Sequence, residues 1–363
     1  MSLGIYIHLP FCRQHCTYCP FVISTDLSAQ DAYVDALVAE IASKAGGEEV
    51  DTVYLGGGTP SRTSVENLAR VTAAIRKHFA VAGDAEFTIE ANPEDVDEHA
   101  LEQWRALGVN RVSIGVQSFH DDELAPLARL HGRERAIAAV RAAVASGVRT
   151  NLDLILGLPG QTAASFRESL DVAIGLGAGH LSMYLLDLDE KTPLQTQVAR
   201  GRTILPEEDL VVSLYVEAVA RLGEAGLAQY EVSNFARTGE ETRHNLRYWH
   251  RREYHSFGIG AHSFLGARRF ANTRDIHRYI NRDFAPAFAE ELGEAERTRE
   301  ELFLGLRQTA GIQSSDVVRL RGEEGRLWIE RGIEDGWLRR VGSRVAFTPA
   351  GFLLSNGYIS QLF

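Results

Sequence analysis

Strand-like and helix-like segments alternate along the first two thirds of this 363-residue chain, and this alternation limits the fold more than any other feature. Short runs rich in β-branched and aromatic residues alternate with longer segments whose apolar residues recur every three or four positions. Several of the helical segments end in glycine, as helix C-termini often do. The expected strands are residues 4–9, 51–56, 86–91, 111–116, 150–156, 180–186 and 228–235, and the expected helices lie between them.

Repeated strand-helix units predict an α/β fold with a parallel sheet, because each helix returns the chain to the start of the next strand. Units of about 25 to 45 residues fit a partial barrel of the (β/α)6 type, and a doubly wound open sheet is the alternative. In either fold, the carboxyl ends of the strands lie at one edge. Glu90, Gln117 and Asp153 each lie at or near the end of an otherwise apolar strand and are therefore candidate site residues, although hydrogen bonding at the barrel rim would also explain them.

The pattern changes after residue 235. Residues 236–290 are dense in aromatic, histidine and arginine residues and are expected to be rich in loops. Residues 291–363 read as helices followed by a hairpin that turns at Gly342 and Ser343, which resembles a winged-helix-like α+β module. We therefore predict a barrel domain (1–235), a basic aromatic region (236–290) and a C-terminal module (291–363). The module is slightly acidic, so we expect packing or substrate covering rather than DNA binding.

Charge and hydropathy exclude several classes of partner. A formal net charge of -11 argues against general affinity for nucleic acid or anionic lipid. No apolar run approaches the ~20 residues that span a bilayer, and the first residues do not resemble a targeting segment. We expect a cytoplasmic protein that meets membranes only through a partner.

All three cysteines, Cys12, Cys16 and Cys19, lie within the segment "CRQHCTYC". An odd, clustered set without distant partners does not make a disulfide framework, so metal ligation is the better interpretation. Zinc would need a fourth ligand, for which His8 and His15 are available. A [4Fe-4S] cluster on three cysteines would instead leave one iron open to a small molecule. Downstream, "YLGGGTPS" frees backbone groups to approach a ligand and lacks the lysine of a phosphate loop.

The cysteine spacing after the first strand, followed by "GGGTPS", resembles the radical S-adenosylmethionine (SAM) superfamily. In that family the amine and carboxylate of SAM bind the open iron, and an electron from the cluster cleaves SAM to a 5'-deoxyadenosyl radical. The resemblance implies a [4Fe-4S] cluster on the three cysteines. It also implies SAM contacts from Tyr6, Tyr18, Gly57, Gly58, Thr59, Glu90, Gln117, Arg129 and Asp153.

Further segments, "EANPE", "RVSIGVQSF", "LDLILGLPGQT", "YEVSNFAR" and "RHNLRYW", resemble the oxygen-independent coproporphyrinogen III oxidase-like family, which includes heme chaperones. The oxidases carry a further cysteine where this chain has Phe21, and this difference favours the chaperone branch. Pro20 is less typical of that branch, and its presence has no physical explanation. The resemblance thus implies a protein that transfers heme to apo-haemoproteins, with a low-potential electron donor that the sequence does not identify. The alternatives are a radical enzyme acting on a porphyrinogen, and a radical SAM methyltransferase or tRNA-modifying enzyme. No catalytic residue is assigned.

The segment "RHNLRYW" resembles a heme-associated motif of the chaperone branch. It implies a heme contact through His244, Asn245, Tyr248 and Trp249, with His244 as an axial iron ligand; a loop histidine bonded to backbone is the alternative. Residues 243–282 also contain nine arginines against two acidic residues, interleaved with aromatic residues. Such a surface suits a porphyrin with carboxylates, but it would also suit RNA or a solvated basic face.

Overall fold

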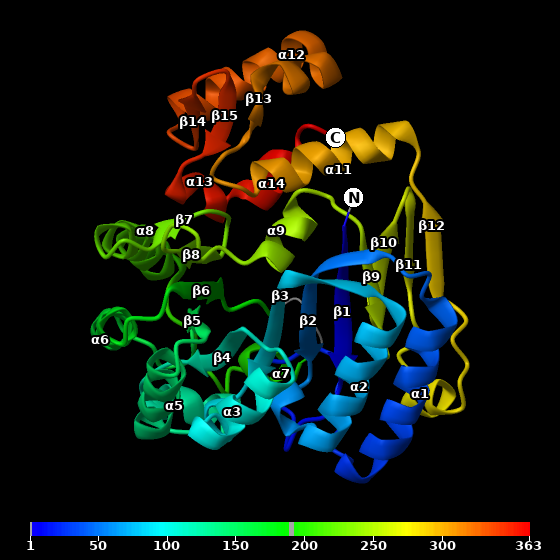
Figure 1. The fold of residues 1–363 in the computed structure, drawn as a ribbon. Coiled ribbons are helices and arrows are strands. Elements are labelled where there is room, and N and C mark those ends of the chain that lie inside the picture. The colour runs from blue at the N-terminus through cyan, green and yellow to red at the C-terminus, as the bar shows by residue number, and fades with distance from the viewer. Residues whose placement is uncertain (1, 189–191) are drawn as a thin grey trace.

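A computed structural model describes residues 2–188 and 192–363. Its first six strands run parallel and in sequence order, which confirms the α/β prediction and the partial barrel (Figure 1). They are β1 (Leu3–Leu9), β2 (Glu49–Gly57), β3 (Ala80–Ala91), β4 (Arg111–Gln117), β5 (Arg149–Leu156) and β6 (His180–Leu185).

Helices cover the outer face of the barrel and connect its strands (Figure 1). The sequence sets their ends locally: Ser64 caps α2 by accepting a hydrogen bond from the Asn67 backbone, and Gly147 follows α5 with a φ of +75°. These helices are α1 (Gln30–Lys44), α2 (Val65–His78), α3 (Glu98–Ala106), α4 (Asp121–Leu124), α5 (Arg133–Ala145), α6 (Ala163–Gly175) and α8 (Glu208–Glu224). A further helix, α7 (Pro193–Ala199), lies against the loop that follows β1, where the Leu194 amide donates to the Thr17 carbonyl at 2.9 Å.

The parallel series ends at β6. The segment expected to form a seventh strand is divided into β7 (Ala228–Gln229) and β8 (Asn234–Ala236), and β8 pairs antiparallel with β6. The barrel therefore stays open on this side, as a partial barrel does.

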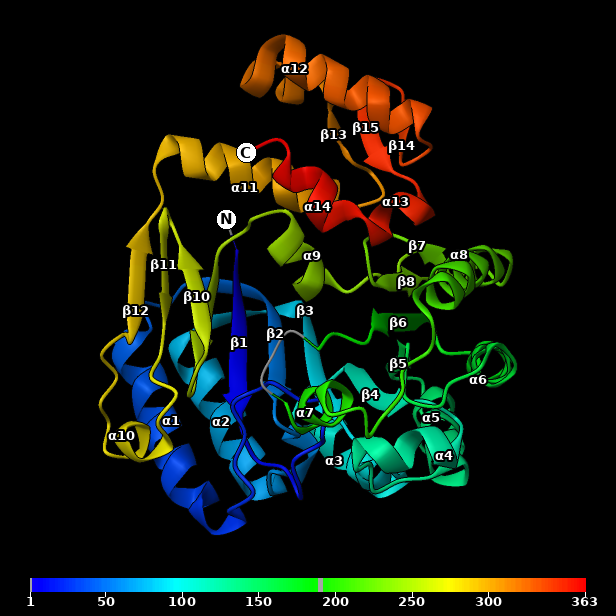
Figure 2. The same ribbon diagram turned by 180° about the vertical axis from the view of Figure 1, so that it is seen from behind.

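Residues 236–290 contain more regular structure than the sequence predicts. Here β9 (Tyr254–Phe257) pairs parallel with β1, and β10 (His262–Leu265), β11 (Arg268–Ala271) and β12 (Phe288–Glu291) extend the same sheet antiparallel (Figure 2). The expectation of a loop-rich region missed these strands, because strands of four residues, with arginines among them, leave no apolar run to recognise. The region also contains α9 (Arg243–Trp249) and α10 (Ile276–Ile280).

The C-terminal module packs at the amino ends of the barrel strands, beside the N-terminus (Figures 1 and 2). The Gln308 side chain donates to the Trp249 carbonyl at 3.2 Å, so the module rests on α9 and does not cover the opposite end of the barrel. Its small sheet contains the predicted hairpin. The elements are α11 (Glu294–Leu306), β13 (Ile312–Gln313), α12 (Ser314–Glu334), β14 (Leu338–Val341), β15 (Arg344–Phe347), α13 (Pro349–Leu353) and α14 (Ser355–Ser360). Among the described helices, none combines the length and the apolar character that crossing a bilayer requires.

Candidate functional site

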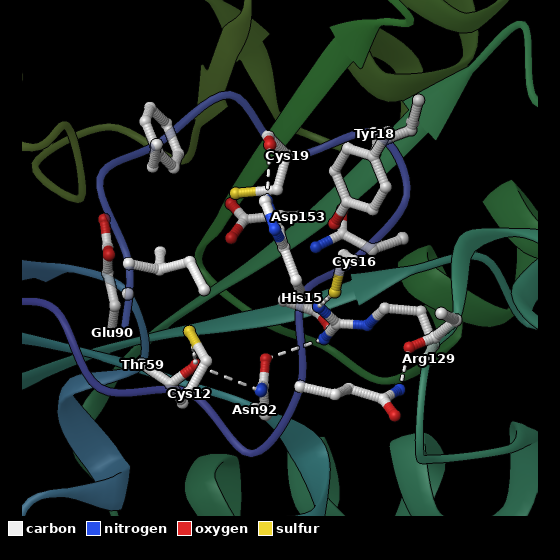
Figure 3. A pocket seen from close by; sticks show the side chains of 18 of the residues that line it. Cys12, His15, Cys16, Tyr18, Cys19, Thr59, Glu90, Asn92, Arg129 and Asp153 are labelled. Atoms are coloured by element: carbon white, nitrogen blue, oxygen red, sulfur yellow. Dashed lines mark hydrogen bonds between the residues drawn. The ribbon is translucent and has the colours of Figure 1, made fainter. Parts of the chain in front are cut away.

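The loop that carries the three cysteines follows β1 and lies over the carboxyl ends of the strands. A second loop, after β2, meets it closely: the Gly58 amide donates to the Leu9 carbonyl at 2.9 Å, and the Thr59 amide to the Phe11 carbonyl at 3.0 Å. A Cβ atom at Gly58 would lie 2.5 Å from the Pro10 backbone, so this approach requires glycine. The two loops enclose a cavity of about 430 Å³, and Figure 3 shows the three cysteine side chains around it.

The cysteine sulfurs have few protein partners. The Cys12 sulfur lies 3.3 Å from the Thr59 hydroxyl, and an Arg129 guanidinium nitrogen lies 3.7 Å from the Cys16 sulfur. Burial raises the pKa of Cys12 to about 11 and also raises that of Cys19, so these thiols need a cation to ionise near neutral pH. Such a cation would be supplied by iron, which deprotonates a coordinating thiol.

The arrangement of the thiols fits a cluster better than a single ion. In the described part of the chain, no three His, Cys, Asp or Glu side chains converge as ligands of one metal ion. Each cysteine of a [4Fe-4S] cluster binds a different iron, so convergence on one point is not required. The two histidines considered as zinc ligands bond to backbone instead: His8 Nε2 lies 2.8 Å from the Val22 carbonyl oxygen, and His15 Nε2 lies 3.0 Å from that of Cys19.

Two half-buried carboxyl groups face the same cavity from β3 and β5. Glu90 accepts hydrogen bonds from the Tyr54 hydroxyl at 2.8 Å and the Gly57 amide at 3.1 Å. Asp153 accepts one from the Asn151 amide group at 2.8 Å. Burial raises the pKa of Glu90 to about 7 and that of Asp153 to about 6. A ligand with positive charge or several donors would therefore bind here together with ionisation of these groups.

Arg129 is fixed beside the carboxyl groups by its neighbours. It donates to the Asn92 side-chain oxygen at 2.7 Å and to the Gly115 carbonyl at 2.6 Å, and Asn92 in turn donates to the Thr59 hydroxyl at 3.3 Å. Asn92 thus connects two predicted site residues, although we did not predict it; its place directly after β3, within "EANPE", was the available signal. Gln117 has a φ of +67°, rare for a residue with a side chain, which marks this strand end as constrained.

The structure brings almost all predicted SAM contacts into one cavity. Tyr6 is the exception: it lies on β1 and lines a second cavity of about 520 Å³. Ser113 and Tyr184 line the first cavity and were not predicted. The predicted residues that share the first cavity with the three cysteines are Tyr18, Gly57, Gly58, Thr59, Glu90, Gln117, Arg129 and Asp153.

His244 lies outside both cavities, at the amino end of the barrel. It is buried, with Nδ1 2.9 Å from the Thr52 hydroxyl and Nε2 2.8 Å from the Tyr248 hydroxyl. Its ring stacks on that of Tyr54 with 5.1 Å between the centroids. Burial, with the nearby charge of Arg247, lowers the pKa of His244 to about 3. Both ring nitrogens already have partners, so iron ligation by His244 would require both contacts to break.

The whole of α9 closes the amino end of the barrel. The Glu86 carboxylate accepts the backbone N–H groups of Arg243 and His244 at 3.2 and 3.0 Å, and also pairs with Arg111 at 3.1 Å. Of the other predicted heme contacts, Asn245 and Trp249 line neither cavity, whereas Tyr248 lines the second. Within the described residues, five of the nine arginines of residues 243–282 form ion pairs, which leaves a less basic surface than the sequence suggests: Arg243, Arg247, Arg251, Arg269 and Arg278.

Comparison with known proteins identifies the family. The chain is 34% identical to the heme chaperone HemW of Bacillus subtilis, over 97% of this chain and 96% of that protein. It is 38% identical to the heme chaperone HemW of Mycobacterium tuberculosis H37Rv, over 99% of this chain and 94% of that protein. The chain belongs to the HemW family.

Two further comparisons agree with membership of the HemW family. Residues 6–173 match the radical SAM superfamily, which implies a [4Fe-4S] cluster and SAM. The fold is similar to that of coproporphyrinogen III oxidase (HemN) from Escherichia coli, with a TM-score of 0.85 and 24% identity over 99% of this chain and 90% of that one. At this identity the likeness to HemN concerns the fold, whereas the likeness to the HemW proteins extends through nearly the whole sequence.

Proposed function

We propose that the chain is a heme chaperone, which binds heme and transfers it to apo-haemoproteins. The observation that carries this proposal is the similarity to proteins named heme chaperone HemW over 94–96% of their length. Phe21 supports it, because it stands where the family resemblance implies a further cysteine in the oxidases. We place its action in the cytoplasm, where clustered thiols stay reduced and able to hold a cluster.

We infer that Cys12, Cys16 and Cys19 each bind one iron of a [4Fe-4S] cluster and leave the fourth iron open. This assignment is supported by three thiols around one cavity with few protein partners. When bound, the cluster supplies one-electron chemistry. The roles of this chain are to hold the cluster in the loop after β1 and to bind the ligand of the open iron beside it.

For that ligand we propose SAM. Its ammonium and sulfonium groups are cations, and Glu90 and Asp153 offer half-buried carboxyl groups of raised pKa that a cation would ionise. Backbone groups of Gly57, Gly58 and Thr59 would receive the methionyl part, and the ring of Tyr18 would lie against the adenine. We assign supporting polar contacts with SAM to Gln117 and Arg129, which line the first cavity. Tyr6 lines the second cavity, so it would contact SAM only from that side.

Direct transfer of heme can be tested with reconstituted protein loaded with hemin under anaerobic conditions. It is mixed with an apo-haemoprotein in the presence of apo-albumin, which captures any heme released to solution. The transfer rate should rise with the concentration of the apo-haemoprotein, because direct transfer depends on an encounter between the two proteins. A rate that does not depend on the acceptor, or loss of all heme to albumin, would contradict the proposal.

A second candidate function is a radical enzyme that acts on a porphyrinogen. The cavity that holds the three cysteines, Glu90 and Asp153 favours it, because a site for cluster and SAM is the common requirement of radical SAM chemistry. Incubation with SAM, a reductant and coproporphyrinogen III would then give a decarboxylated product. Unchanged porphyrinogen, with heme transfer intact in the same preparation, would leave the chaperone as the function.

A further inference from the structure

The second cavity lies between the cysteine loop and the antiparallel extension of the sheet, where no cofactor has been assigned. Its volume of about 520 Å³ falls within the ~300–1,000 Å³ of ligand sites. Figure 2 shows β10, β11 and β12 beside β1, with the cysteine loop at the carboxyl end of β1. Pro20 and Phe21 line both cavities, so the second cavity directly adjoins the cluster site.

The floor of the second cavity is a row of side chains that crosses three strands. His262 on β10 pairs with Ala271 on β11, and Ala271 pairs with Phe288 on β12. Neighbouring strands lie about 4.8 Å apart, so His262 and Phe288 stand about 10 Å apart across the three strands. Only the methyl group of Ala271 lies between them. Phe21 and Phe288 are 63% and 45% exposed, which is unusual for two phenyl groups that border the same cavity.

His262 differs from the histidines whose rings are hydrogen-bonded within the protein. It is exposed at the cavity, and no described residue forms a hydrogen bond with its ring, whereas both ring nitrogens of His8 and of His244 have partners. Partial burial and the charge of Arg274 lower the pKa of His262, which keeps an imidazole lone pair available at neutral pH.

Arg274 supplies a cation at the rim of the same cavity. It is exposed, and among the described residues it has no ion-pair partner, unlike Arg269 and Arg278 nearby. A free guanidinium group beside an apolar floor suits a flat apolar molecule that carries carboxylates. The cavity thus combines an iron ligand, two aromatic walls and a carboxylate partner.

We propose that iron porphyrin binds in this second cavity, with His262 as a ligand of the iron, Phe21 and Phe288 against the ring and Arg274 on a propionate. The proposal rests on the function proposed above and locates its cargo beside the cluster site instead of at α9. Tyr248, the one residue of "RHNLRYW" that lines this cavity, would connect the motif to the heme without iron ligation by His244.

The test is an anaerobic titration of the reconstituted protein with hemin, followed by the position of the Soret band and by affinity. In H262A the band should shift, the affinity should fall on the order of tenfold or more, and added imidazole should restore the band. R274Q should weaken affinity about two- to fivefold without moving the band, because it removes only a carboxylate contact. H277A is the matched control: His277 is exposed on the neighbouring α10 and lines neither cavity.

Each outcome separates the site from the function. If the wild-type chain binds no hemin, the proposed function fails, and the site fails with it. If it binds hemin and H262A keeps the same band and affinity, the function survives and this site is refuted. The site is refuted equally if H244A, still folded and loaded with cluster, loses the band that H262A retains.

Discussion

At the carboxyl end of the barrel strands, Cys12, Glu90 and Asp153 face a cavity, whereas at the amino end His244, Glu86 and Arg111 face one another. Both ends are rich in polar and aromatic groups, and both carry a segment that resembles a ligand motif. The difference lies in the partners. The polar groups of the first end line a cavity, whereas those of the second are held mainly by protein atoms. A histidine within a motif is therefore a ligand candidate only where its nitrogens are free.

The largest effect should follow replacement of a cysteine. We expect Cys12→Ala to abolish the iron-sulfur absorbance of anaerobically reconstituted protein, and SAM binding with it, because a [4Fe-4S] cluster on two protein thiols has lost a required ligand. Circular dichroism should stay that of the wild type, since Cys12 lies in a loop outside the core. Within the same loop, His15→Ala is the control and should keep a full cluster. A Cys12→Ala protein with four irons would contradict the ligand assignment.

At the opposite end, the expected effect is on stability. His244→Ala leaves a buried void and removes the partners of Thr52 and Tyr248, which together should cost about 3–5 kcal/mol of unfolding free energy. Urea unfolding followed by circular dichroism measures this change. Tyr248→Phe, which removes only one hydroxyl group, should cost about 1 kcal/mol. The folded fraction of His244→Ala should still hold cluster and hemin; unaltered stability together with lost hemin binding would reverse our assignment of the two ends.

Much of the first end could be predicted from the sequence, because loops after parallel strands place their residues at one edge whatever the details of packing. This argument brought Glu90 and Asp153 together with the cysteines. It could not place Tyr6, because the second cavity that Tyr6 lines is completed by β9, which pairs with β1, and by the strands beyond β9. Nor could it show that His244 is buried against Thr52, 192 residues earlier, since that contact exists only when α9 plugs the barrel.

The two ends should also respond to pH with opposite sign. The fold raises the pKa of Glu90 to about 7 and of Asp153 to about 6, so without a ligand their contribution to stability is present below pH ~4 and is lost as pH rises through 6–7. The pKa of His244 is lowered to about 3 from ~6.5 in the unfolded chain. Its contribution is therefore present above pH ~6.5 and is lost as pH falls toward 3.

The part of this pH dependence that belongs to His244 should be a smaller effect than the replacement of His244 by alanine. Between pH 7 and pH 5 its contribution to the unfolding free energy should fall by about 2 kcal/mol, because over this range His244 becomes protonated in the unfolded chain and stays neutral in the folded chain. Urea midpoints of the wild type and His244→Gln at both pH values measure the difference. The slope should decrease in the variant without vanishing, since burial also lowers the pKa of His8 and of His255 to about 4. His99→Ala, at an exposed position of α3, should keep the wild-type slope. Equal slopes in His244→Gln and the wild type would mean that the ring reaches water in the folded protein, and the amino end of the barrel would then be as open to a ligand as the carboxyl end.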